Sequence, residues 1–148
     1  MQKSTIPADN NIRPFLEKAQ RSLECACESK DKKRYDSAIS RLYYALFQIC
    51  KELCVKKGYQ YSIKRYDVSK RQDKWVCEPV KHETRIRKAE IEGAFYRAQR
   101  SEIAILLNHL YTQRCQADYD MVPISEPNLN RNWGKAIQEF DRIKKEIL

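Results

Sequence analysis

The stretch between Tyr35 and Val55 constrains the fold more than any other part of the sequence. Apolar side chains recur along it at helical spacing, and the run from Leu42 to Phe47 is apolar around the whole circumference of a helix. A helix on the surface of a protein keeps one polar face, so this segment is too apolar to lie on the outside. We therefore predict a helix that forms the centre of a bundle, or that faces both a core and a second subunit.

The remaining sequence favours helices as well. The 148 residues suffice for one domain, 1–148, with a core of its own, and three Gly and five Pro are few for a fold rich in β-turns. Helical patterns predict a first helix from about Pro14, two more over about 80–93 and 94–119, and a last one from about Asn128. The predicted fold is all-α, an up-and-down bundle of four or five helices.

Positive charge gathers in the middle of the chain. Between residues 56 and 100 there are 13 Lys and Arg against 6 Asp and Glu, so this stretch carries +7 of the net charge of +9. Such an asymmetry suggests a polyanionic partner, with RNA or DNA as the first candidate. A solvated helical face rich in Lys and Arg would have the same composition.

Segment 57–79 is the least regular part of the sequence, and it interleaves aromatic with basic residues. Basic side chains contact phosphates and aromatic rings stack on bases, which is how proteins grip single-stranded nucleic acid. A loop anchored by aromatic residues looks the same, so plain packing remains the alternative. The candidate RNA-binding residues are Lys64, Arg65, Lys70, Arg71, Tyr61 and Tyr66.

Several classes of protein and site are not expected. No apolar run reaches the length of a membrane span, and residues 1–7 lack the apolar core of a secretory signal, so we expect a cytoplasmic protein. Thiols are kept reduced there, and Cys50 and Cys54 lie one helical turn apart in an apolar stripe, as buried small hydrophobic residues do. The cysteines and two histidines lack the spacing of zinc ligands, so we expect neither a metal nor a cofactor.

Two stretches carry a resemblance to a known family. The run from Asp36 to Phe47, with Arg41 before Leu42-Tyr43-Tyr44, resembles the second helix of small prokaryotic HEPN-domain proteins. The segment from Arg114 to Asp120 resembles the Arg-x-x-x-Asp-Tyr sequence that closes their penultimate helix. The likeness extends over most of the chain outside 57–97.

The resemblance implies a helical bundle that forms a homodimer. Many HEPN proteins are encoded beside a minimal nucleotidyltransferase in toxin–antitoxin pairs, or belong to defence systems, so such a protein is an expected partner. The residues expected at the dimer interface are Tyr43, Tyr44, Phe47 and Arg114.

The sequence departs from the family at the catalytic motif. Active members are metal-independent ribonucleases with an Arg-x(4–6)-His motif that meets its copy across the dimer. Neither His82 nor His109 has an Arg at that spacing, and no His follows Arg114. A carboxylate beside an arginine is a weak base, so Asp118 replaces the missing histidine poorly. The catalytic candidates are Arg114, Asp118, Tyr119 and His109.

Three functions follow from these patterns. The leading prediction is a non-catalytic or degenerate HEPN dimer that binds RNA or a partner protein in a prokaryotic defence or toxin–antitoxin module. The second is a metal-independent ribonuclease that uses Arg114 with Asp118 or His109. The third is a scaffold subunit of a larger assembly, docked through its apolar helix.

Overall fold

The computed structural model of the chain describes the backbone of residues 6–148 and the side chains of residues 14–148. Residues 1–5, on which the expectation of no secretory signal partly depends, lie outside the described part. The elements, in order, are α1 (Ile6–Asp31), α2 (Tyr35–Lys57), β1 (Gln60–Asp67), β2 (Gln72–Pro79), α3 (Lys88–Arg97), α4 (Ser101–Tyr119) and α5 (Glu126–Ile147). The predicted helical bundle is confirmed, whereas the strictly all-α assignment is wrong, because β1 and β2 form a small antiparallel sheet.

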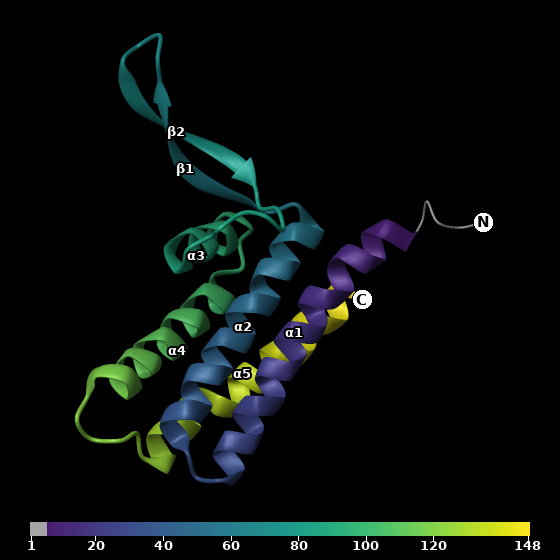
Figure 1. The fold of residues 1–148 in the computed structure, drawn as a ribbon. Coiled ribbons are helices and arrows are strands. Elements are labelled where there is room, and N and C mark those ends of the chain that lie inside the picture. The colour runs from purple at the N-terminus through teal and green to yellow at the C-terminus, as the bar shows by residue number, and fades with distance from the viewer. Residues whose placement is uncertain (1–5) are drawn as a thin grey trace.

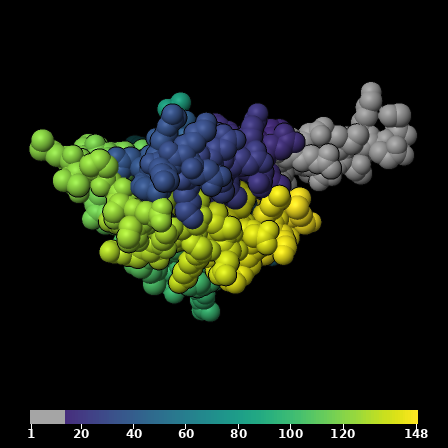
Figure 2. All heavy atoms as spheres, turned by 90° about the horizontal axis from the view of Figure 1, so that it is seen from below, coloured from purple at the N-terminus to yellow at the C-terminus, as the bar shows by residue number. Residues whose placement is uncertain are grey.

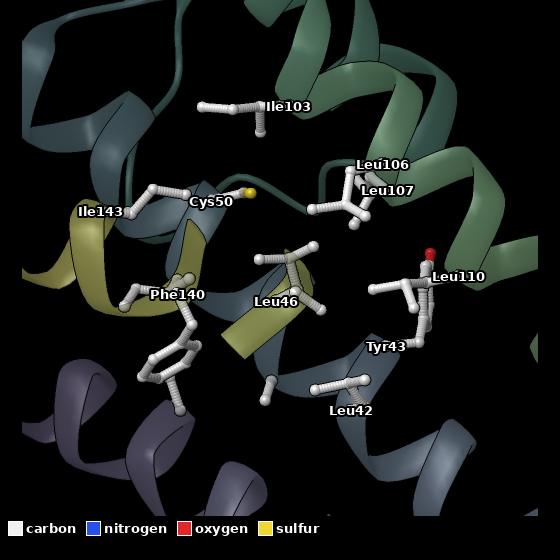
Figure 3. Packing of buried hydrophobic residues seen from close by; sticks show 14 of the residues in the cluster. Leu42, Tyr43, Leu46, Cys50, Ile103, Leu106, Leu107, Leu110, Phe140 and Ile143 are labelled. Atoms are coloured by element: carbon white, nitrogen blue, oxygen red, sulfur yellow. The ribbon is translucent and has the colours of Figure 1, made fainter. Parts of the chain in front are cut away.

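The helix α2 lies at the centre of the bundle, with α1, α4 and α5 packed against it (Figure 1). Its residues Leu42, Leu46 and Cys50 are almost completely buried and face side chains of α4 and α5, as Figure 3 shows. Burying an aliphatic side chain of this size contributes about 1.5–3 kcal/mol. Neighbours on several sides therefore explain most of the apolar circumference predicted for this segment, but Tyr44 remains 49% exposed.

Cys50 and Cys54 are buried in the core, as their place in the apolar stripe predicts. Burial raises the pKa of the Cys54 thiol to about 12 and that of Cys50 well above its usual range. Both side chains therefore stay protonated and unreactive near neutral pH.

Most of segment 57–79 forms a regular β-hairpin, over residues 60–79, which corrects its description as the least regular part of the chain. Gly58 closes α2 in the left-handed conformation, with a φ of 70°. Antiparallel pairing follows, with Gln60 opposite Pro79 and Asp67 opposite Gln72. The hairpin projects beyond the end of the bundle (Figure 1), where it has little apolar surface to cover. That is why its sequence lacks the apolar runs that mark a buried strand.

The helices α3 and α4 begin later than predicted, whereas α5 begins two residues earlier, at Glu126. Residues 80–87 are not helical, and α3 begins after Arg87, whose backbone N–H donates to the Glu90 carboxylate at 2.9 Å. Between α3 and α4, Gln99 takes a positive φ of 61°, which breaks the helix that the pattern continued through this point. The first helix begins at Ile6, ahead of the predicted start at Pro14.

The start of α5 and the residues just before it are fastened to the start of α2. The Tyr35 hydroxyl donates to the Glu126 carboxylate at 2.6 Å, and the Asp36 carboxylate accepts from the Ile124 N–H at 2.8 Å. Seen from this end in Figure 2, α5 lies directly beneath the α1–α2 pair. Within residues 6–148, none of the helices combines the length and apolarity that crossing a bilayer requires.

Candidate functional site

A cleft of about 570 Å³ opens between α2, the start of α3 and α4. Four aromatic and three basic side chains surround it, together with Ala89. They are Tyr43, Tyr44, Phe47, Tyr111, Arg87, Lys88 and Arg114. Aromatic faces beside cations suit a ligand that is both flat and negatively charged.

Arg114 lies at the surface of the cleft. Its guanidinium carbon is 5.3 Å from the ring centroid of Tyr43, and its Nε is 3.5 Å from the Asp118 carboxylate, which also accepts from the Ser40 hydroxyl at 3.5 Å. The guanidinium carries five N–H donors, and this single contact leaves most of them for a ligand. Arg114 is therefore held on an aromatic ring while its charge remains accessible.

Arg114 does not occupy the position of α4 that faces the core. The neighbouring Gln113 takes that position and is only 4% exposed. Its amide donates to the Asn128 carbonyl at 2.6 Å and accepts from the Asn132 amide at 3.0 Å, both on α5. A buried, hydrogen-bonded glutamine thus fills the core position. Arg114 is the next residue along the helix and faces the cleft instead.

The start of α3 supplies the other two cations. The Lys88 ammonium lies 4.8 Å from the ring centroid of Tyr111 and 3.0 Å from the Glu92 carboxylate. Arg87 is paired more loosely with Glu90, at 3.4 Å. Arg87 and Lys88 thus reach the cleft from the start of α3, and Arg114 reaches it from α4. Both elements pack against α2.

Tyr43 forms the wall of the cleft inside the protomer. It is 5% exposed and packs against Phe47 and Tyr111, at ring-centroid distances of 6.0 Å and 5.6 Å. Burial raises the pKa of its hydroxyl to about 12, so it remains a neutral phenol. Of the residues expected at a dimer interface, Tyr43 therefore offers the least surface.

Tyr44 offers far more exposed surface than Tyr43 does. It is 49% exposed, and three surface recesses meet at its ring. One is the cleft already described, the second also contacts Arg41 and Lys18, and the third contacts Phe15. Tyr44 is thus the centre of an open face of α2 between α1 and α4.

The catalytic candidates do not all meet in one place. Arg114 contacts Asp118, but His109 and Tyr119 are both exposed and neither belongs to the described lining of the cleft. Five residues of an α-helix correspond to a rotation of about 140°, so His109 points away from Arg114. Within the described residues, the side chains of the cleft thus include no histidine.

Besides Arg114 and Asp118, the structure brings together a second pair of titratable residues, His82 and Glu52, which the sequence analysis did not identify. The Nε2 of His82 lies 2.9 Å from the carboxylate of Glu52, which is 2% exposed in the inner face of α2. The His82 ring stacks on Phe15 at 4.8 Å, and its backbone carbonyl accepts from Lys51 at 2.8 Å. Burial raises the pKa of Glu52, and the contact with His82 opposes that rise. These contacts fasten segment 80–87 to α1 and α2.

The hairpin separates the six RNA-binding candidates into different surroundings. Lys64 lies opposite Trp75 on one face, and Tyr66 shares that face. Arg65 lies on the other face, where it pairs with Glu78 at 2.8 Å. The remaining three are Tyr61, buried in the core cluster, and Lys70 and Arg71, in the loop between the strands.

No three His, Cys, Asp or Glu side chains of the described part of the chain gather as metal ligands would.

Residues 12–126, more than three quarters of the chain, match the family model for the HEPN domain. They run from inside α1 to the first residue of α5 and include both stretches in which the resemblance was noted. Neither the curated proteins nor the solved structures provide a match.

Proposed function

The chain belongs to the HEPN family, and on that basis we propose that it is a homodimeric RNA-binding protein that does not cut RNA. A HEPN domain suggests a nucleotide- or RNA-related function, or a role of the toxin–antitoxin kind. The observation that supports RNA is the cleft in which Arg114 and Lys88 lie on the rings of Tyr43 and Tyr111. The missing histidine supports binding without cleavage, because a metal-independent ribonuclease needs a base near neutral pKa.

Replacing Arg114 with alanine should weaken the binding of a short single-stranded RNA about tenfold or more, since one charge-assisted contact to a phosphate is lost. The slope of log affinity against log salt should also become shallower by about 0.7. Both quantities are measured by fluorescence anisotropy with a labelled RNA of mixed sequence.

The matched control is Arg131→Ala, which removes the same charge from an exposed position on α5, outside the described lining of the cleft. It should leave the affinity nearly unchanged. Equal losses in the two variants would show that the cleft has no special part in binding. Affinity that does not respond to salt would contradict a phosphate-binding site altogether.

The dimer is proposed to form through the open face of α2 around Tyr44. Three recesses converge on this ring, and exposed aromatic and apolar side chains, Phe15 and Tyr111 among them, surround it. Two copies joined through this face would cover apolar surface and bring two Arg114 clefts close together. The proposed setting is a prokaryotic defence or toxin–antitoxin module, with a nucleotidyltransferase or another defence protein as the further partner.

Tyr44→Glu should convert the dimer into a monomer, because it places a charge at the centre of the covered face. The mass in solution, measured by light scattering, should fall from two chains to one. Tyr96 is also exposed, on α3, and Tyr96→Glu should leave the mass unchanged. A wild-type protein that is monomeric at high concentration would contradict the proposal.

A further inference from the structure

The hairpin carries exposed aromatic rings that the bundle does not use. Trp75 is 69% exposed and Tyr66 is 61% exposed, and both lie on a part of the chain that extends away from the helices (Figure 1). Large aromatic side chains this accessible contribute little to the stability of the fold, since they bury little surface. Their position requires another explanation.

The strand register places these rings on one face. Lys64 lies directly opposite Trp75, and Tyr66 lies opposite Asp73, two positions farther along. Directly paired residues point to the same side of a sheet, so Trp75 and Tyr66 are diagonal neighbours, with Cα atoms about 7–8 Å apart. This arrangement is an aromatic platform on a two-stranded ribbon.

The cations on the two faces of the hairpin have different partners. On the opposite face, Arg65 pairs with Glu78 and Lys74 with Asp67, so both cations have acidic partners. On the aromatic face, the ammonium of Lys64 lies 5.3 Å from the Trp75 ring centroid. That cation rests on an aromatic ring and keeps its hydrogen-bond donors for a ligand.

The same face continues as a basic track toward the bundle. Ser62 lies on it, opposite Cys77, and its hydroxyl accepts a hydrogen bond from the guanidinium of Arg97 at the end of α3. Lys70 and Arg71 lie at the other end, in the exposed loop. Cations thus stand at both ends of the aromatic platform as well as beside it, and Asp73, opposite Tyr66, is the acidic residue on this face.

We propose that this face, with Lys64, Tyr66 and Trp75, is a second binding site that takes single-stranded polynucleotide, separate from the cleft at Arg114. The inference rests on the proposed RNA-binding function and assigns the hairpin a part in it. Bases stack on Trp75 and Tyr66, while phosphates contact Lys64 and the basic ends of the track. The protein then holds one strand at two places, the hairpin and the cleft, which raises the overall affinity through effective concentration.

The test uses the full-length protein and a short labelled single-stranded RNA. Trp75→Ala and Tyr66→Ala should each weaken binding about 5- to 150-fold, as the loss of one base–aromatic stack does. Both residues are exposed, so the thermal unfolding curves of the variants should match that of the wild type. Lys64→Ala should weaken binding and flatten the salt dependence, whereas Lys74→Ala, on the opposite face, should do neither.

Tryptophan fluorescence reports the contact directly. The chain has two tryptophans, of which Trp133 is buried in the core and Trp75 is exposed. Added RNA should quench the emission of the wild type, and the quenching should disappear in Trp75→Phe. A single-stranded DNA of the same sequence in a parallel titration shows whether the site requires the ribose hydroxyl.

The outcomes separate the two proposals. RNA binding that is weakened by Arg114→Ala but indifferent to Trp75→Ala, Tyr66→Ala and Lys64→Ala would overturn the hairpin site and leave the proposed function standing. Binding lost in the hairpin variants, with quenching of Trp75, supports the site. No RNA binding by the wild type would overturn both proposals. Binding of a partner protein through Trp75, without salt dependence, would show that the hairpin face does not take a polynucleotide.

Discussion

Replacing His82 with alanine is expected to lower the free energy of unfolding by about 2–4 kcal/mol. The change removes the 2.9 Å contact that the buried Glu52 carboxylate makes with His82, together with the stacking of that ring on Phe15. A carboxylate buried without this partner has lost its water and gained little in exchange. Chemical denaturation at neutral pH measures the loss.

A double variant separates the contribution of the Glu52 charge from the other effects of removing His82. His82→Ala combined with Glu52→Gln should recover part of the stability, because the buried group that remains is neutral. An additive result, with no recovery, would contradict the pairing. Since segment 80–87 ends at Arg87 and leads directly to Lys88, His82→Ala should also loosen the cleft and weaken RNA binding.

The pH dependence of the loss follows from Glu52. Burial raises its pKa in the folded protein above the ordinary value of 4.5, and removing His82 takes away a contact that opposes the rise. Well below pH 4.5 the carboxyl is protonated in both the folded and unfolded states, and the part of the cost that comes from its charge is absent. As the pH rises through the folded pKa the cost appears, so the deficit of His82→Ala should grow from acidic to neutral pH. A deficit of the same size throughout would contradict this account.

Arg100→Ala is expected to lower the free energy of unfolding by about 2–3 kcal/mol. The guanidinium donates to both oxygens of the Glu146 carboxylate, at 2.8 and 2.7 Å, and lies 3.4 Å from the Tyr59 hydroxyl. One side chain thus joins the start of α4, the end of α5 and the entry to the hairpin. The melting temperature and the denaturation midpoint should both fall.

The pH profile distinguishes this pair from the one at His82. Arg100 holds the pKa of Glu146 below its ordinary value of 4.5, so the stabilisation is present above that pH and is lost as the pH falls through the folded pKa. The difference between wild type and Arg100→Ala should therefore shrink on acidification. Lys145→Ala breaks an exposed ion pair with Asp141 on the same helix and should change stability little. Equal losses in the two variants would contradict the account.

The central helix could be predicted from the sequence because its signal depends on local spacing alone. An apolar circumference from Leu42 to Phe47 has few physical solutions other than burial on several sides. The break at Gln99 could not be predicted, because a positive φ at a non-glycine residue is imposed by the packing of α3 on β1 and α4. The hairpin was missed because a two-sided, polar ribbon has neither an apolar run nor a strict alternation.

In the candidate site, too, some residues could be predicted from local sequence and others could not. Arg114 and Tyr44 could be identified from the family motifs, since both lie in the two stretches that carry the resemblance. The neighbouring Gln113 bonds to both Asn128 and Asn132, and those partners are supplied by a different helix. Likewise, the pairing of Glu52 with His82 joins residues 30 positions apart. Contacts of that range are fixed by the fold and leave no local pattern.

The most direct measurement follows binding and integrity of RNA in the same sample. Purified wild type and Arg114→Ala are mixed with a labelled single-stranded RNA in the presence of a chelator, and bound and fragmented RNA are both quantified. The account predicts that wild type binds the RNA and leaves it intact, and that Arg114→Ala leaves it intact and mostly unbound. Fragments that appear with wild type and are absent with Arg114→Ala would contradict it, because they would show a metal-independent ribonuclease that works without the usual histidine.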